Sequence, residues 1–217
     1  MTITAFSGID GAGKSTQITL VKEAFQKKNE KAIVIWARGG YTPGINRIKK
    51  ILRKSKSSSI PKSEGRSNER SQAFQKPMVR KVWLILAIID LFFLYGIQVR
   101  WLQIKNYQII FDRFLEDTLM DFKLNFPQEN IESWWIWKLL VSLVPSPNKH
   151  FVLLIPREES QRRSILKNEP FPDSAEVLDK RIKFYKKLIK DSKKYIHINC
   201  MREIKEVYVE IKENMDK

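Results

Sequence analysis

Short apolar segments recur along the chain and alternate with longer segments whose apolar residues keep helical spacing. The short segments predict buried strands at residues 3–6, 31–36, 107–111, 150–155 and 195–198. Helical spacing follows the first of them, where Ile18, Val21 and Phe25 recur, and it returns in 175–189 and 204–211. Strands that alternate with helices are typical of an α/β fold with a parallel sheet and right-handed crossovers. The pattern therefore predicts a single domain over residues 1–217, in which two layers of helices enclose a sheet of about five parallel strands.

The longest apolar stretch, residues 82–97, lies inside a predicted helix at 77–104 that has Pro77 in its first turn. A membrane-spanning helix is one interpretation. The stretch is shorter than the ~20 residues that a span needs, and Asp90 interrupts its middle. We therefore expect a central core helix covered on several sides, with membrane contact as the alternative. A carboxylate on such a helix needs a partner or a polar cavity, so Asp90 is either a structural residue or one that faces a substrate.

Two further segments differ from the strand and helix pattern. Residues 55–70 are rich in Ser, Lys and Arg and contain the breakers Pro61 and Gly65. We interpret about 53–76 as a mobile basic insertion, which either closes over a substrate or forms a solvated surface. The cluster at 134–137 is rich in tryptophan. Core packing is the favoured interpretation of this cluster, and contact with a membrane interface or a partner is the alternative.

The composition narrows the classes of partner and compartment. Hydrophobic residues make up 43% of the 217 residues, which suffices for a core, and the net charge is +16. This charge suits either a polyanionic partner or a solvated lysine-rich surface, but no nucleic-acid-binding signature accompanies it, so no nucleic acid partner is expected. Cys200 is the single cysteine, which excludes an internal disulfide, and the sequence has no Cys/His cluster for a metal. With no signal-peptide pattern at the N-terminus, we expect a cytoplasmic protein.

The first predicted strand leads directly into a glycine-rich turn, residues 8–15, which reads Gly-Ile-Asp-Gly-Ala-Gly-Lys-Ser. Every fixed position of the phosphate-binding template G-x-x-x-x-G-K-[ST] is filled, and the template stands between a strand and a helix, as its mechanism requires. The glycines allow backbone N–H groups to curl around phosphate oxygens, and the helix N-terminus adds partial positive charge. Lys14 would reach the outer phosphates, while the Ser15 hydroxyl would bind Mg²⁺.

Charged residues follow two of the other predicted strands, at the sheet edge where ligands bind in open α/β folds. Asp112 and Arg113 follow the strand at 107–111. An aspartate at that position would orient Mg²⁺ through water, and an arginine beside it would bridge phosphoryl oxygens. Arg38 follows the strand at 31–36 and either contacts a phosphate or is solvated.

Residues 157–163 open a charged segment that Pro170 and Pro172 interrupt. We interpret 157–173 as a lid that would bring Arg162 or Arg163 onto the transferred phosphate. Surface arginines on a helix are the alternative.

Several of these segments resemble the thymidylate kinases of the P-loop nucleoside monophosphate kinase group. Residues 6–17 look very like that family's opening F-x-G-x-D-G-x-G-K-S-T-Q. Asp112-Arg113-Phe114 is similar to its D-R-[YF]. Residues 155–158, followed by Arg162 and Arg163, look like its P-x-E and lid arginines, and Asn199-Cys200-Met201 stands where the family contacts adenine. The resemblance follows the chain in order over most of its length.

The resemblance implies a three-layer P-loop NTPase fold and transfer of the γ-phosphoryl group of ATP to dTMP, with Mg²⁺ bound alongside the nucleotide. It implies ATP contacts at Gly8, Gly11, Ala12, Gly13, Lys14, Ser15, Thr16, Asn199 and Cys200. The implied magnesium ligands are Ser15 and Asp112. The implied acceptor contacts are Asp10, Arg38, Phe74, Asp90 and Arg113. The implied catalytic residues are Lys14, Arg113, Asp10, Arg162 and Arg163. Because Ala12 stands where one branch of the family has an arginine, the resemblance places the catalytic arginine on the lid.

The acceptor side departs from the family pattern. Leu91 follows Asp90 where the family has an arginine, and residues 115–119 stand where the family has S-x-A-Y-Q. We therefore predict a nucleoside monophosphate kinase with dTMP as the best single acceptor. Two alternatives stay open: a P-loop kinase for another small acceptor, such as a nucleoside or a sugar phosphate, and a catalytically idle nucleotide-binding protein associated with a membrane or a partner. A homodimer also stays open.

Overall fold

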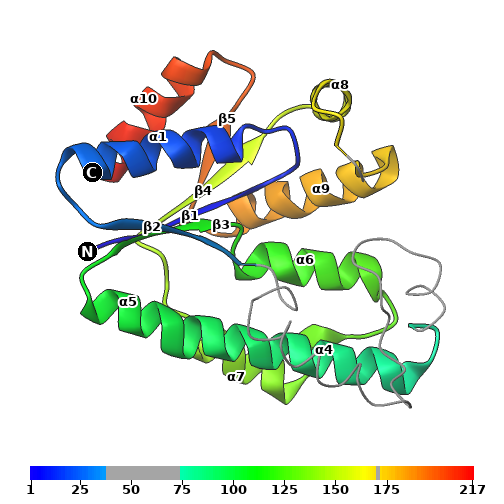
Figure 1. Cartoon of the computed structure of the whole chain (residues 1–217). Coiled ribbons are helices and arrows are strands. Elements are labelled where there is room, and N and C mark those ends of the chain that lie inside the picture. Colours follow the sequence, from blue (N-terminus) through cyan, green and yellow to red (C-terminus); the bar gives the residue numbers. More distant parts are fainter. Residues whose placement is uncertain (38–73, 170–171) are drawn as a thin grey trace.

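The computed structural model describes residues 1–37, 74–169 and 172–217. Within these ranges the strands are β1 (Ile3–Gly8), β2 (Ala32–Trp36), β3 (Gln108–Asp112), β4 (Lys149–Leu154) and β5 (Tyr195–Asn199). They pair in parallel in the order β2-β3-β1-β4-β5. The predicted five-stranded parallel sheet is confirmed, with strand ends that differ from the predicted ones by one or two residues (Figure 1).

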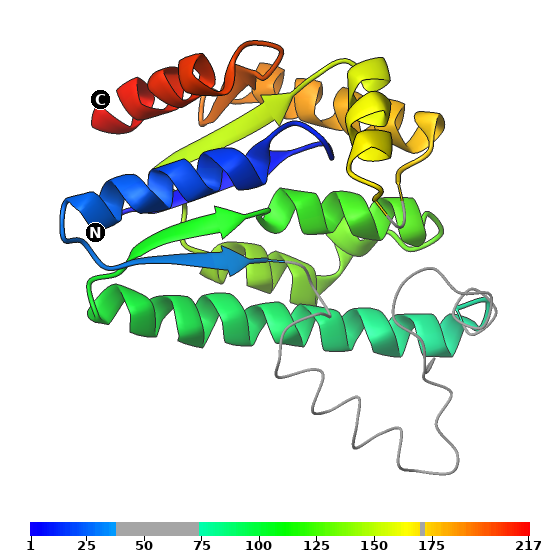
Figure 2. The ribbon, with the colours of Figure 1, turned by 45° about the horizontal axis from the view of Figure 1, so that its top comes forward.

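Helices lie on both faces of this sheet. They are α1 (Lys14–Lys27), α4 (Pro77–Phe92), α5 (Arg100–Ile104), α6 (Leu115–Asn125), α7 (Trp135–Leu143), α8 (Arg157–Leu166), α9 (Ala175–Asp191) and α10 (Ile204–Asp216), with a π-type segment η1 (Phe93–Val99) and a 3₁₀ turn η2 (Ile131–Ser133). In Figures 1 and 2, α1 and α10 cover one face, while α4, α5, α6 and α7 lie on the other. Helix α9 packs beside α6. The three predicted layers are therefore present.

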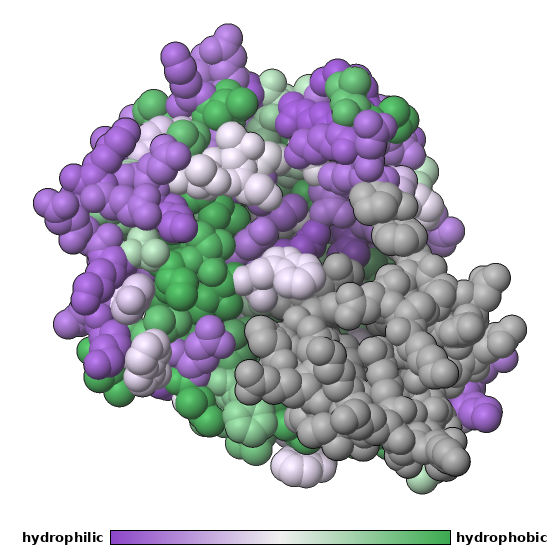
Figure 3. All heavy atoms as spheres, viewed as in Figure 1, coloured by the Kyte–Doolittle hydropathy of each residue, from purple (hydrophilic) through white to green (hydrophobic). Residues whose placement is uncertain are grey.

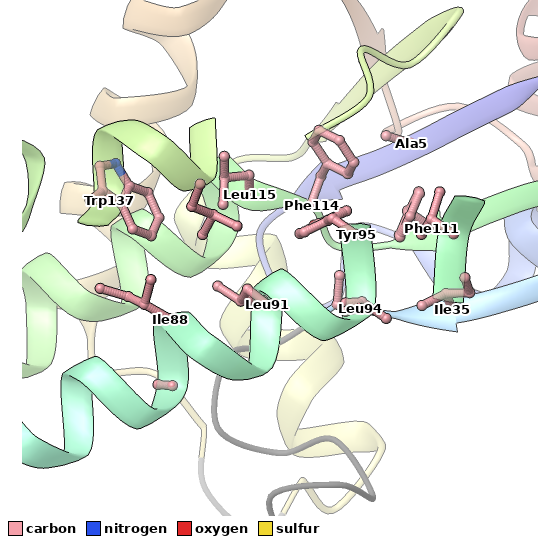
Figure 4. Close-up of a cluster of buried hydrophobic side chains, with 14 of the residues drawn as sticks. Ala5, Ile35, Ile88, Leu91, Leu94, Tyr95, Phe111, Phe114, Leu115 and Trp137 are labelled. Atoms are coloured by element: carbon pink, nitrogen blue, oxygen red, sulfur yellow. The ribbon is translucent and has the colours of Figure 1, made fainter. Parts of the chain in front are cut away.

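Alternation along β1 divides its side chains between two hydrophobic cores. Ile3 and Ala5 belong to the core shared with α4, α6 and α7, whereas Phe6 packs with α1 and α10. Figure 4 shows the first of these cores, where side chains of the long helix face those of α6, α7 and the sheet. Since β1 is buried from both sides, the turn that follows Gly8 starts from a firmly held position.

The long apolar helix is continuous from Pro77 to Ile104, through α4, η1 and α5. In the described residues it alone is long and apolar enough to cross a membrane, and 44% of its most apolar window is buried. The inner face, with Leu91 and Tyr95, is fully buried, but Phe93 and Trp101 on the outer face are more than half exposed. The prediction of a helix covered on several sides therefore holds only in part: the sheet, α6 and α7 cover its inner face, while in the described part of the chain its outer face is exposed (Figure 2).

The tryptophan cluster is divided between core and surface. Trp137 is buried and packs against Phe122, whereas Trp135 is 74% exposed. Core packing is thus confirmed for part of the cluster only. In the surface view of Figure 3, apolar side chains gather over β2 and the α5 end of the long helix. Membrane contact and a homodimer both stay predictions. The basic insertion was predicted at 53–76, and its residues 53–73 lie outside the described residues.

Candidate phosphoryl-transfer site

The glycine-rich turn has the backbone that a phosphate-binding loop requires. Gly8, Gly11 and Gly13 all have positive φ angles, of 135°, 75° and 88°. A Cβ at position 8 would collide with the carbonyl oxygen of Leu153 on the neighbouring strand β4. Only glycine adopts such conformations without strain, and Gly13 then passes the chain into α1 at Lys14. The loop therefore sits between β1 and the N-terminus of α1, where helix N–H groups favour an anion.

Lys14 lies folded into this loop. Its ammonium donates hydrogen bonds to the carbonyl oxygens of Gly8 at 2.9 Å and Ile9 at 2.7 Å, and it lies 3.9 Å from a carboxylate oxygen of Asp10. Burial, together with the charge of Arg113, lowers the pKa of Lys14 to about 8. An incoming phosphate would be a stronger partner than neutral carbonyl groups, because hydrogen bonds between charged groups are about twice as strong.

Arg113 pairs with Asp10 across the ends of two adjacent strands. In β1 and β3, Phe6 and Asp112 are register partners, and the N–H of Arg113 donates to the carbonyl of Phe6 at 2.9 Å. Arg113 itself has a φ of 70°, a conformation that favours glycine, so the tight turn after β3 is strained. The turn directs its guanidinium to Asp10, with 2.5 Å between Arg113 Nη2 and Asp10 Oδ1.

The charges of this pair are mutually stabilised. Burial opposes ionisation of Asp10, but Arg113, Lys14 and Arg181 together hold its pKa below the usual value. Burial also works against a charge on Arg113, yet Asp10 and Asp117 raise the pKa of Arg113, so it remains a cation. The site thus holds a fixed cation beside the phosphate loop at neutral pH.

A buried polar network behind Arg113 was missed by sequence reasoning. Asp117, on α6, is 1% exposed and accepts hydrogen bonds from Ser7 Oγ, from the Phe114 N–H at 2.9 Å and from the Tyr185 hydroxyl at 2.7 Å. Its carboxylate also lies 3.8 Å from Arg113 Nη1. The signal that could have been used is the spacing of four residues between Arg113 and Asp117, which would place both side chains on one face of a helix that begins after β3.

His150 joins the same network from β4. Its Nε2 lies 2.8 Å from Ser7 Oγ, and the residue is 2% exposed. Burial lowers the pKa of His150 below its usual value. The imidazole is therefore neutral at pH 7, and it supports β1 from within the fold.

The predicted lid is a helix, α8, that packs directly on the loop. The Ser160 hydroxyl donates to the carbonyl of Asp10 at 2.7 Å. Arg163 donates to the carbonyls of Gly11 at 3.1 Å and Cys200 at 3.3 Å, so it bridges the phosphate loop and the segment after β5. Arg162, in contrast, has a 61% exposed side chain and its hydrogen bonds go to Glu159. The structure brings Arg163 to the loop and leaves Arg162 at the surface.

Other predicted site residues occupy the rim of the loop. Ser15 and Thr16 are exposed in the first turn of α1, and Ala12 is buried beside them. Asp112 is partly buried at the end of β3, and burial raises its pKa. Ser15 and Asp112 both offer the oxygen ligands that Mg²⁺ prefers.

The adenine candidates are Asn199, the last residue of β5, and Cys200, which follows the strand. The side-chain oxygen of Asn199 accepts from the N–H of Met201 at 3.1 Å, which closes a turn. Cys200 is buried, and burial raises the pKa of its thiol to about 12, so it is no nucleophile. The contact between Arg163 and the Cys200 carbonyl nevertheless keeps this segment adjacent to the loop.

The acceptor-side candidates lie on several elements of the fold. Asp90 is buried in α4. Phe74 is partly buried and packs against the hydrophobic core, and its ring centroid lies 5.5 Å from that of Trp83 and 5.1 Å from that of Phe126. Arg38 lies outside the described residues. Of the predicted acceptor contacts in the described residues, only Asp10 and Arg113 are shown in contact with each other.

Comparison with known proteins identifies the family of this chain. A family model described as thymidylate kinase matches residues 6–211, almost the whole chain. The chain belongs to the thymidylate kinase family. The crystal structure of thymidylate kinase from Ehrlichia chaffeensis matches with a TM-score of 0.55 and 18% identity, covering 100% of this chain and 98% of that chain. At this identity the likeness shows the fold. No curated protein matches the sequence.

Membership of the thymidylate kinase family has direct consequences for the site. The protein is a phosphotransferase of the nucleoside monophosphate kinase type, and the family acts on small nucleotides, with ATP as donor and typically with Mg²⁺. The predicted P-loop NTPase fold is confirmed.

Proposed function

We propose that this protein transfers the γ-phosphoryl group of ATP to dTMP and forms dTDP. The observation that carries the proposal is the Arg113–Asp10 pair, which stands beside a complete phosphate loop at the ends of β1 and β3. A fixed cation at that position meets the charge that develops on a transferring phosphoryl group. Family membership supports the reaction class, and dTMP is the acceptor that the family name supplies.

The donor half of the site fits ATP. The positive φ angles of the loop glycines let the backbone curl so that its N–H groups would surround phosphate oxygens, and Lys14 lies within the loop. The hydroxyl of Ser15 and the carboxylate of Asp112 would hold Mg²⁺, because both are oxygen ligands at the rim of the loop. When bound, Mg²⁺ would neutralise phosphate charge during transfer.

The chain's own residues would then position and neutralise. Arg113 would contact the transferring group from the β3 side, and Arg163 from the lid side, where it already binds the loop carbonyl of Gly11. Asp10 holds Arg113 in place and would face the acceptor. No covalent enzyme intermediate is required, since alignment of the two nucleotides and charge stabilisation supply the rate enhancement.

A panel of acceptors with ATP and Mg²⁺ tests the proposal. We expect dTMP to be converted to dTDP, and Lys14→Ala to abolish the conversion, whereas Lys27→Ala, an exposed lysine at the end of α1, retains it. If dTMP is inert while a nucleoside or a sugar phosphate is phosphorylated, the acceptor assignment is wrong. If no compound is phosphorylated, ATP is not consumed, and the protein binds anionic vesicles in a flotation assay, the alternative of a catalytically idle, membrane-associated protein is favoured. A cytoplasmic location stays a prediction.

A further inference from the structure

Helices α6 and α9 are joined by two buried polar contacts, one turn apart. Asp117 and Asp121 stand four residues apart on α6, and Arg181 and Tyr185 stand four residues apart on α9. The Tyr185 hydroxyl donates to Asp117 at 2.7 Å, and Arg181 Nη2 donates to Asp121 at 2.7 Å. Residues spaced by four lie on one face of a helix, so the two contacts form parallel rungs between the helices.

Arg181 is also fixed from a second direction. Its Nε donates to Asp173 at 2.7 Å, and the residue is 7% exposed. Two carboxylates thus hold the guanidinium in one orientation and leave its third nitrogen available. Nη1 of Arg181 is buried and has no hydrogen-bond partner among the described residues. A buried donor without a partner is unfavourable, and natural proteins usually provide one, often as a ligand or an ordered water.

The position of Arg181 indicates which ligand would bind there. The first rung carries Asp117, which lies 3.8 Å from Arg113, so the second rung is one helical turn from the catalytic pair. Arg181 contacts Asp121, one turn along α6 from Asp117, and Asp117 is the residue that lies beside Arg113. The unpartnered donor therefore belongs to the transfer site, on the side of α6 and α9.

This side is distinct from the one that would hold the donor nucleotide. The triphosphate would occupy the loop N–H groups and the N-terminus of α1, flanked by α8 through Ser160 and Arg163. Arg181 lies on α9 and is hydrogen-bonded to α6, so it would reach the transferring phosphoryl group from the side of the acceptor nucleotide. The charged, forked guanidinium suits a phosphate oxygen better than a neutral group.

We propose that Arg181 is a phosphate-binding residue of the acceptor subsite, with Nη1 donating a hydrogen bond to the phosphate of the acceptor nucleotide. The inference rests on the proposed function in that it assumes an acceptor that carries a phosphate. Asp121 and Asp173 are positioning residues that hold the guanidinium for this contact.

Steady-state kinetics of Arg181→Gln test this directly. We expect the KM for dTMP to rise roughly 10- to 100-fold, the range that one charge-assisted hydrogen bond supplies, while the KM for ATP changes little. Arg181→Lys keeps the positive charge and loses the forked guanidinium, so the KM for dTMP should rise less than in Arg181→Gln. Because the charge stays between Asp121 and Asp173, this variant is also the one expected to fold most like the wild type. Lys187→Gln, an exposed change on the same helix, is the matched control. Equal increases in both KM values in a folded variant would overturn the proposal.

A binding measurement separates this inference from the choice of dTMP. Inorganic phosphate is titrated into protein already saturated with Mg²⁺ and a non-hydrolysable ATP analogue, so that the loop is filled. The wild-type protein should bind phosphate, and Arg181→Gln should bind it at least tenfold more weakly. If the wild type does not turn over dTMP but binds phosphate more tightly than Arg181→Gln, dTMP is not the acceptor, and the role of Arg181 in phosphate binding is still supported. No phosphate binding by the wild type, or equal binding by both proteins, would refute the role of Arg181.

Discussion

Arg113 Nη2 lies 2.5 Å from Asp10 Oδ1, although 103 residues separate them in the chain. The contact exists because β1 and β3 are neighbours in the sheet and both end at the same edge. Asp10 belongs to the phosphate loop, and Arg113 belongs to the D-R-F segment. Among the described contacts, Arg113 is the only residue of that segment whose side chain pairs with the loop. This pairing converts two short motifs into one site.

The lid assignment leads to a first prediction. Arg163→Ala should lower kcat about 100-fold or more, because it removes a cation already held at the phosphate loop, whereas Arg162→Ala should change kcat less than about threefold. Steady-state kinetics of both variants with saturating ATP check this. A large loss in Arg162→Ala alone would mean that α8 rotates on nucleotide binding and exchanges the two arginines.

Nucleotide binding should be linked to proton uptake at Lys14. In the free protein the pKa of Lys14 is about 8, so at pH 8 about half of the lysines are neutral. Bound phosphates would raise that pKa, and the complex should therefore take up about half a proton per ATP at pH 8, and much less at pH 6.5. Calorimetry in buffers of different ionisation enthalpy measures this uptake. Lys14→Ala should abolish it, and a wild-type protein that releases protons instead would contradict the account.

The loop glycines give a prediction about stability. Gly8→Ala should destabilise the fold by about 3 kcal/mol or more, because a Cβ there meets the Leu153 backbone and φ is 135°. Gly96 lies in the long helix, and a Cβ there meets nothing within 4 Å. Gly96→Ala should therefore stabilise the protein by about 0.5–1 kcal/mol. Denaturant unfolding of both variants measures these free energies, and a neutral Gly8→Ala would show that the loop can rearrange.

His150 should make stability depend on pH. Its pKa is lowered by burial in the folded protein, so below its unfolded value of about 6.5 the unfolded chain binds more protons than the folded one. The free energy of unfolding should consequently fall as the pH drops below about 6.5, by at most about 1.4 kcal/mol per pH unit. His150→Gln should flatten this dependence, which urea unfolding from pH 7 to pH 5 would reveal.

The second histidine offers a matched control for that experiment. His197 is exposed on β5, so His197→Gln removes a histidine outside the buried network. If His197→Gln flattens the pH dependence and His150→Gln does not, burial of the imidazole is not the cause.

The sequence by itself determined the features that depend on local spacing. Residues 8–15 hold the complete loop template, and five short apolar segments predict the five strands to within two residues of their ends. Such features can be predicted from neighbouring residues, because the conformation of a glycine-rich turn and the burial of a strand depend on which residues stand close together in the sequence. The same reasoning overestimated how deeply the helix at 77–104 is buried, since periodicity shows that a face is apolar and not what covers it.

Only the tertiary structure decided which distant side chains meet. It placed Arg163 rather than Arg162 at the loop, packed Phe74 against the hydrophobic core, and brought Asp117 to 3.8 Å from Arg113 and Arg181 to Asp121. The order of strands and the rotation of each helix about its axis determine these contacts. A change of one residue in helical phase turns a side chain by about 100°, and spacing alone does not fix that phase relative to a partner 60 or more residues away.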